Sequence, residues 1–151
     1  MMKQKTVLII VGLLVMAAGG LRLKTFFTDA PATATIKDQT ITVDIAATPA
    51  ARARGLGGRL ELPANSGMVF IFDKSERHNF WMKDMFFPID IIWIDGGQVV
   101  DITENVPPPA LGQLKLPLYS PANPANIVLE ANAGFAAKYN IRVGDPFFIK
   151  Y

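Results

Sequence analysis

The stretch that decides the fold contains Gly67-Met68-Val69-Phe70-Ile71-Phe72, then Phe80-Trp81-Met82-Lys83, then Ile89-Asp90-Ile91-Ile92-Trp93-Ile94. The first run is continuously apolar and has the length of a strand, which predicts a strand that is buried on both faces. Residues 78–83 and 89–94 predict two further strands. Asp95-Gly96-Gly97 then predicts the turn of a hairpin that continues into a strand at 98–103. The middle of the chain is therefore expected to form a sheet.

On the N-terminal side, apolar and polar residues alternate between residues 35 and 46, which predicts a half-buried strand or a hairpin around Asp38-Gln39. Thr48 followed by Pro49 is typical of a helix N-terminus, because a threonine side chain caps the first backbone N–H groups and proline fits the first turn. The predicted helix ends at Arg54, since a glycine follows it.

On the C-terminal side, six prolines lie between residues 106 and 124, a density that excludes a helix or a central strand and predicts a long loop or arm. A strand at 126–131, a helix at 132–140 and an edge strand at 146–151 follow. Together these elements predict an α+β, mostly β fold, with a single curled or barrel-like sheet of six or seven strands and two short helices.

Residues 1–24 combine a short basic start with about a dozen apolar residues, which is the composition of a signal peptide or an N-terminal membrane anchor. The composition turns to Thr, Ala, Pro and Asp over residues 25–35, which predicts a linker and leaves 36–151 as one globular domain. We therefore expect an exported protein, periplasmic or extracytoplasmic. It would be tethered to the inner membrane if the first segment is not cleaved.

The composition excludes several classes of function. The 15 basic and 13 acidic residues are interspersed and leave a net charge of +2, so no nucleic-acid partner is expected. The chain has no cysteine, which excludes disulfides, thiolate catalysis and the usual zinc sites.

A soft-metal site for Cu(I) could be formed by Met68, His78, Met82 and Met85. Methionine also fills gaps in protein cores, and we expect that role here, with no metal and no cofactor.

Two carboxylates interrupt apolar runs, Asp90 and Glu130. If such a group is buried it must be paired, because burying an isolated charge is very costly. Arg54, Arg59 and Lys83 are the obvious partners. Two interpretations stay open: ion pairs that tie the helix to the sheet, or a pocket in which arginine binds an anionic group. Trp81 likewise either packs in the core or stacks on a sugar.

These residues resemble the domain of unknown function 192 family. The resemblance covers about residues 40 to 150 and rests on Arg54-Gly55-Leu56 with Arg59, on residues 67–72, 80–83 and 88–91, and on Val128-Leu129-Glu130, Asn132-Ala133-Gly134 and Gly144-Asp145. The chain departs from the family pattern at Gly57 and at Met85-Phe86-Phe87. The resemblance implies a small exported or membrane-tethered β domain, and it carries no activity to transfer.

The sequence favours a non-enzymatic module that binds a small molecule or an envelope component, and it identifies no catalytic set. One alternative is a hydrolase that acts on envelope carbohydrate through Asp90 and Glu130, which would have to converge on one bond. Another is a structural or protein-interaction module that docks through the proline-rich loop 106–124. If the chain is a binding module, the loop 106–124 is expected to form the rim of its ligand-binding face. The predicted ligand-binding residues are Arg54, Arg59, Trp81, Lys83, Asp90 and Glu130.

Overall fold

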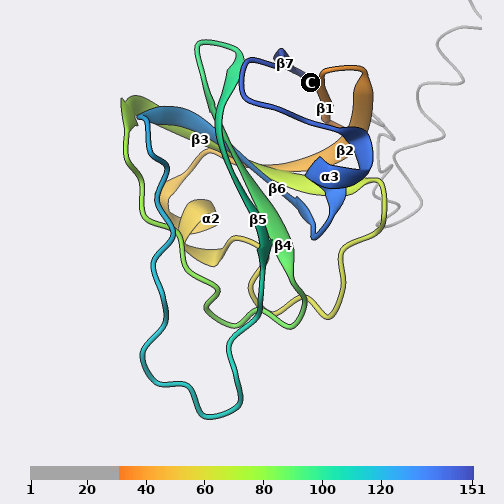
Figure 1. The fold of residues 1–151 in the computed structure, drawn as a ribbon. Helices are drawn as coiled ribbons and strands as arrows, with labels where there is room; N and C mark the ends of the chain where they lie inside the picture. The colour runs from red at the N-terminus through yellow and green to blue at the C-terminus, as the bar shows by residue number, and fades with distance from the viewer. Residues whose placement is uncertain (1–30) are drawn as a thin grey trace, which may run out of the picture.

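The computed structural model describes residues 31–151, which form one seven-stranded sheet with two short helices (Figure 1). The strand order is β5-β4-β6-β3-β2-β1-β7. Neighbouring strands are antiparallel except β2 and β3, which run parallel. The elements are β1 (Thr33–Ile36), β2 (Gln39–Ala46), α2 (Pro49–Arg54), β3 (Ser66–Glu76), β4 (Ile89–Asp95), β5 (Gln98–Val106), β6 (Ala125–Asn132), α3 (Phe135–Tyr139) and β7 (Phe147–Lys150).

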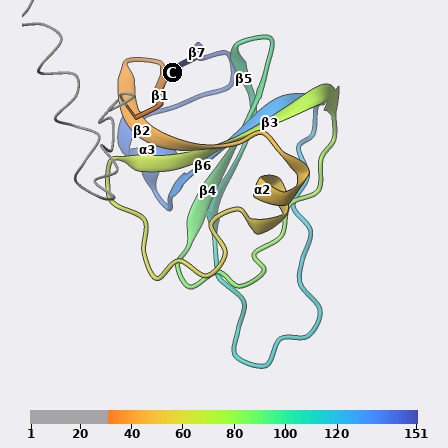
Figure 2. The ribbon, with the colours of Figure 1, turned by 180° about the vertical axis from the view of Figure 1, so that it is seen from behind.

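The sheet curls until its two edges meet at one end. The start of β5 contacts the start of β7, where the Val99 N–H donates to the Asp145 carbonyl at 2.9 Å and the Phe147 N–H donates to the Gly97 carbonyl at 2.9 Å. Figures 1 and 2 both show the β4–β5 turn beside β7. The predicted fold class, a curled and mostly β sheet with two short helices, is confirmed.

Alternation along the central strands divides the core between the two faces of the sheet. On β3, Val69 belongs to one buried cluster and its neighbours Met68 and Phe70 belong to the other. On β4, Ile92 and Trp93 are divided in the same way. The first cluster includes residues of α3, and the second includes residues of the segment that follows α2. The predicted burial of β3 on both faces is therefore confirmed for its first half.

One predicted strand is wrong. Residues 78–83 form no strand, and only Phe80 pairs there, exchanging two backbone hydrogen bonds of 2.8 Å with Tyr119. Phe80 and Met82 are nevertheless buried, while Trp81 and Lys83 are exposed. The alternation that predicted a strand therefore comes from an irregular segment packing every second side chain against the core.

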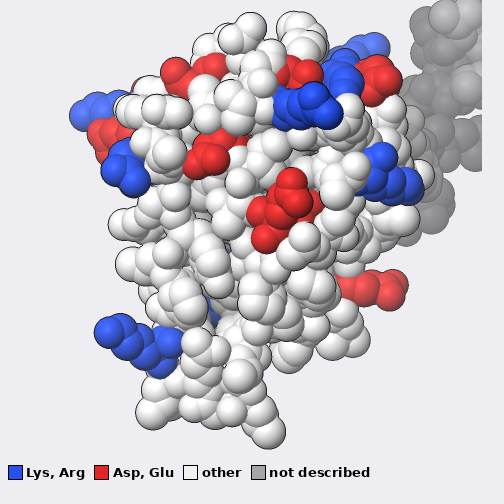
Figure 3. Space-filling view, in the orientation of Figure 1, with Lys and Arg blue, Asp and Glu red and all other residues white. Residues whose placement is uncertain are grey.

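The predicted proline-rich loop is confirmed. Residues 107–124 contain neither helix nor regular strand and project away from the sheet as an arm (Figure 1). Leu111 and Leu114 on this arm are fully exposed. Figure 3 shows this lower end of the molecule almost free of charged side chains, whereas acidic and basic groups gather at the other end.

The N-terminal predictions fall largely outside the described residues. The signal peptide or anchor at 1–24 lies wholly outside them, and strand β1 begins at Thr33, within the segment 25–35 that was expected to be linker. Among residues 31–151, no helix is long and apolar enough to cross a membrane.

Candidate functional site

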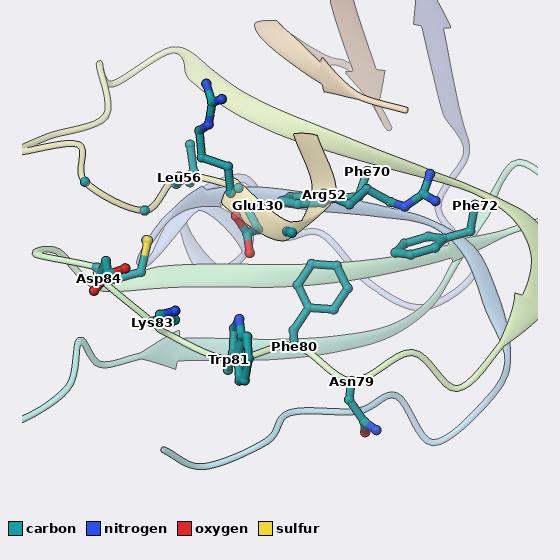
Figure 4. Close-up of a pocket in the computed structure, with 16 residues that line it drawn as sticks. Arg52, Leu56, Phe70, Phe72, Asn79, Phe80, Trp81, Lys83, Asp84 and Glu130 are labelled. Atoms are coloured by element: carbon teal, nitrogen blue, oxygen red, sulfur yellow. The ribbon is translucent and has the colours of Figure 1, made fainter. Parts of the chain in front are cut away.

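A pocket of about 510 Å³ opens on the face of the sheet that carries α2 (Figure 4). Its volume lies in the usual range of small-molecule sites, which is roughly 300–1,000 Å³. Four segments enclose it: α2 with the turn after it, strand β3, the irregular segment 79–85, and strand β6. The lining residues are Arg52, Ala53, Arg54, Gly55, Leu56, Gly57, Gly58, Phe70, Phe72, Asn79, Phe80, Trp81, Lys83, Asp84, Met85 and Glu130.

Helix α2 forms one wall and is fixed at both of its ends. At its start, the Thr48 hydroxyl accepts a hydrogen bond of 3.2 Å from the Ala51 N–H, and Pro49 occupies the first turn, as predicted. The Arg52 side chain then donates from Nη1 to the carbonyls of Ala47 and Ile71, at 2.7 and 2.8 Å. Arg52 therefore clamps the helix to the sheet.

The turn after α2 closes one side of the pocket. Gly55 has a φ of +53°, and a Cβ atom there would lie 3.3 Å from the ring of Phe70, so a side chain at this position is disfavoured both by backbone conformation and by space. The Gly58 N–H donates to the Asp84 carbonyl at 2.8 Å, which joins this turn to the irregular segment 79–85.

The segment 79–85 supplies the aromatic wall. The ring of Phe80 packs edge-on against Phe70 and Trp93, with centroid distances of 4.9 and 5.3 Å. By contrast, Trp81 is 53% exposed, and the Lys83 Nζ lies 5.9 Å from the centre of its ring. This wall therefore has a buried aromatic side and an accessible one, both at the pocket (Figure 4).

Glu130 provides the buried polar group of the pocket. It lies on β6 between Met68 of β3 and Ile91 of β4, is 5% exposed, and points into the pocket in Figure 4. Burial raises its pKa to about 8, because the charged form loses its hydration. Among residues 31–151 its carboxyl has no hydrogen-bond partner and no ion-pair partner. The floor of the pocket thus carries a carboxyl group whose raised pKa favours the neutral form at pH 7.

Asp90, which the sequence grouped with Glu130, lies on the opposite face of the sheet. Residue 90 pairs in register with Ala131, and residue 91 with Glu130, so the two carboxylates point in opposite directions. The Asp90 carboxylate accepts backbone hydrogen bonds from Asn105, Gly134 and Ala136, at 2.8, 3.1 and 2.9 Å. It secures the start of α3 and does not line the pocket.

The pocket unites four of the six predicted site residues: Arg54, Trp81, Lys83 and Glu130. Arg59 is not among them, because it pairs with Asp44 at 2.7 Å on the surface. Neither Arg59 nor Lys83 forms the predicted ion pair with Asp90 or Glu130, since the Arg59–Asp44 pair is the one salt bridge of residues 31–151.

Sequence reasoning missed the aromatic lining and Arg52. Phe70 and Phe72 lie two positions apart on β3 and therefore share a face, which the sequence could have revealed.

The proline-rich arm does not form the predicted rim, because none of its residues lines the pocket. Its base supports the wall instead, through the pairing of Tyr119 with Phe80 and a hydrogen bond of 2.5 Å from the Ser120 hydroxyl to Asn79.

The soft-metal alternative receives no support from the placement of its members. His78 stacks on Phe72 with a centroid distance of 3.7 Å and does not line the pocket. Met68, Met82 and Met85 are buried in the core cluster on this face of the sheet, and Met85 also lines the pocket. Within the described range 31–151, no group of three or more His, Cys, Asp or Glu side chains could hold a metal ion.

Comparisons with known proteins agree on the fold and assign no activity. The family model "DUF192: Uncharacterized ACR, COG1430" matches residues 32–149. No functionally curated protein matches the sequence.

Solved structures that are similar to this chain include those of two bacterial proteins. A protein of unknown function from Novosphingobium aromaticivorans DSM 12444 is 29% identical, with a TM-score of 0.69, and the match covers 79% of this chain and 84% of that one. A protein from Sinorhizobium meliloti 1021, described provisionally as a transcription regulator, is 27% identical with a TM-score of 0.66, and the match covers 78% and 92%.

Proposed function

The chain belongs to the DUF192 family, and we propose from the geometry of its pocket that it is a non-enzymatic module that binds a small molecule. The carrying observation is the unpartnered carboxyl group of Glu130 at the floor of a preformed cavity. The carboxyl faces an open cavity and has no hydrogen-bond partner among residues 31–151, so its oxygens are available to a bound molecule. Because a new hydrogen bond there would displace no protein partner, the carboxyl is a natural anchor for a ligand.

The rest of the lining supports a binding role. Ligand sites are mostly apolar and aromatic, with a few polar groups that fix orientation. Here Phe72, Phe80 and Trp81 supply the aromatic surface, and Glu130 and Lys83 supply polar groups at the floor and the mouth. The N-terminal sequence favours export, so an envelope component is the source of ligand that we propose first.

Geometry disfavours the carbohydrate hydrolase. A glycosidase needs two carboxyl groups roughly 5–10 Å apart that flank the same bond. Asp90 and Glu130 lie on opposite faces of one sheet, and the backbone N–H groups around Asp90 already occupy its oxygens. The two residues that this hypothesis requires therefore cannot act on one substrate.

Thermal unfolding of the full chain tests the proposal, followed by tryptophan fluorescence in the presence of cell-wall fragments, anionic metabolites and metals. A ligand at 100 times its Kd stabilises the native state by about 2.7 kcal/mol. The matched variants are Ala53→Trp, which fills the mouth of the pocket from an exposed position on α2, and Ala137→Trp, the same change at an exposed position on α3.

The proposal requires a compound that stabilises the wild type more than it stabilises Ala53→Trp. The same compound should stabilise Ala137→Trp as much as the wild type. If no compound stabilises the chain, or if every hit stabilises Ala53→Trp as strongly as the wild type, the pocket is not the binding site.

A second candidate function rests on the arm. Leu111, Leu114 and Leu118 are all strongly exposed on a segment whose one charged residue is Lys115. Exposed apolar side chains that gather on one segment are typical of a protein-interaction surface. Photo-crosslinking from position 111 in the producing cell would test it. One discrete crosslinked partner, absent when the crosslinker is placed at position 137, is the expected result, and equal labelling from both positions would refute it.

A further inference from the structure

The pocket has two polar poles with an aromatic body between them. At the mouth, Arg54 and Lys83 are exposed, and neither forms an ion pair with any residue from 31 to 151. At the floor, Glu130 is buried. Burial raises the pKa of its carboxyl, which forms no ion pair with Arg54 or Lys83. A molecule that satisfies both poles must extend from one to the other.

The charges of the lining favour an anion at the mouth. Three basic side chains come from α2 and from segment 79–85, against two acidic ones, Asp84 and Glu130, and the raised pKa of Glu130 favours its neutral form at pH 7. Strands β3 and β4 place Met68 and Ile91 beside Glu130 and add no charge. A cationic ligand would have to pass this mouth and then ionise Glu130, whereas an anion meets opposite charge on entry.

The body of the pocket favours a flat apolar ligand. The accessible indole of Trp81 and the rings of Phe72 and Phe80 line it, and aromatic rings attract one another in stacked or edge-to-face arrangements. Because Lys83 lies over the Trp81 ring, an anionic group bound to that ammonium would hold an attached ring beside the indole. The neutral carboxyl of Glu130 offers one O–H donor to an acceptor at the inner end.

We propose that the ligand is an organic anion with a planar apolar body, held at the mouth by Lys83 and Arg54, along its body by Trp81, and at its inner end by Glu130. This inference rests on the proposed function, because it names the ligand class of the same pocket.

Three probes that share one ring system test the charge of the ligand: naphthalene-2-carboxylate, 2-naphthylmethanol and 2-naphthylmethylamine. Their affinities for the full chain are measured by calorimetry at pH 7 and low salt. We expect the carboxylate to bind at least tenfold more tightly than the alcohol and the amine. Lys83→Gln and Arg54→Gln should each remove several-fold of that advantage. Lys138→Gln is the matched control, because Lys138 also lies over an aromatic ring, 4.8 Å from the centre of Tyr139, and is not part of the pocket.

A pH series tests the inner pole. If the anion binds only the neutral form of Glu130, whose pKa is about 8, its affinity falls about tenfold between pH 7 and pH 9. Glu130→Gln should bind the carboxylate at pH 7 and lose this dependence on pH.

Three outcomes overturn the inference. In the first, the amine binds best and its affinity is lost in Glu130→Gln. The pocket would then be a cation site, and the proposed function would still stand. Equal affinities of the three probes would also refute the anionic class. Binding of none of the probes, together with a hit in the thermal screen that Ala53→Trp abolishes, would refute the planar body while the pocket remains a binding site. Failure of both experiments would remove the proposed function itself.

Discussion

Asp90 and Glu130 lie on neighbouring strands, one register position apart, yet their environments are opposite. Asp90 accepts three backbone hydrogen bonds, from Asn105, Gly134 and Ala136, whereas the Glu130 carboxyl meets a cavity lined by rings and a thioether. The difference follows from the pleat of the sheet, because consecutive residues of a strand point to opposite faces. One carboxyl group therefore serves the fold, and the other is free to serve a ligand.

The stability of the protein should fall with rising pH because of Glu130. Its pKa is about 8 in the folded state against an ordinary value of 4.5, so between these values the folded state holds one more proton than the unfolded state. The stabilisation is complete below pH 4.5 and is lost as pH rises through 8, by at most about 1.4 kcal/mol per pH unit. Glu130→Gln does not titrate, so urea unfolding should find it increasingly more stable than the wild type from pH 5 to pH 9. Parallel stability curves for the two proteins would contradict the burial of the carboxyl.

Asp90→Asn should destabilise the protein and leave the pocket intact. The amide keeps one acceptor oxygen and places an NH₂ group against backbone donors, which should cost about 1–3 kcal/mol. Urea unfolding measures the loss, and Asp73→Asn, an exposed residue of β3, is the control. Affinity for naphthalene-2-carboxylate should be unchanged. Loss of binding in a folded Asp90→Asn protein would place Asp90 in the site after all.

At the residue scale, the sequence identifies both carboxylates as exceptional because each interrupts an apolar run. It cannot predict which of them is satisfied. That depends on the register of β4 against β6 and on the packing of α3, and both arise from contacts between residues far apart in the chain. The same reason explains Arg59, whose partner Asp44 lies on β2 and not in the pocket.

At the scale of elements, α2 is the part on which the pocket most depends. A helix of six residues is far too short to be stable alone, so its cap and its clamp to the sheet must hold it in place. The Thr48 cap and the Arg52 bonds to Ala47 and Ile71 do so. These contacts also fix the mouth of the pocket, because Arg54 lies in the last turn of the same helix.

Removing the cap should loosen this wall. Thr48→Ala loses the hydroxyl that accepts from the Ala51 N–H, which should cost about 1 kcal/mol in urea unfolding. Thr48→Ser keeps a hydroxyl at the same position and should restore most of the stability. If serine is no better than alanine, the side-chain cap does not hold α2.

Elements were predictable where local chemistry determines them. Thr48 and Pro49 mark the start of α2, and Gly55 marks its end. The alternation around residues 38–39 corresponds to the hairpin of β1 and β2. Segment 78–83 was mispredicted because its alternation is the same whether the inward side chains belong to a strand or to an irregular segment. What distinguishes the two is strand pairing, and here only Phe80 pairs, with Tyr119 of the arm, far away in the sequence.

At the scale of the whole molecule, the curled sheet is the stable body, and the arm 107–124 lies outside it (Figure 1). Period-two alternation and the glycine turns were sufficient to predict the fold class. The pocket could not be predicted as a cavity, because its walls come from four segments that are separate in the sequence and meet only in the folded chain.

The double substitution Leu111→Ser and Leu114→Ser should change the free energy of unfolding by less than about 0.5 kcal/mol, because both side chains are exposed. Leu129→Ala, in the centre of β6 and fully buried, should cost about 2–5 kcal/mol in the same assay. A large loss from the double variant would mean that the arm is folded onto the body in solution.

The proposed function depends above all on a neutral Glu130 carboxyl at the floor of the pocket. Carbon-13 NMR titration of the full chain labelled at glutamate tests it most directly, with Glu130→Gln to assign the signal. We expect one glutamate to titrate near pH 8, and naphthalene-2-carboxylate to raise that midpoint further, because a bound anion favours the neutral form. If every glutamate titrates near pH 4.5, with no response to the added anion, the claim is wrong.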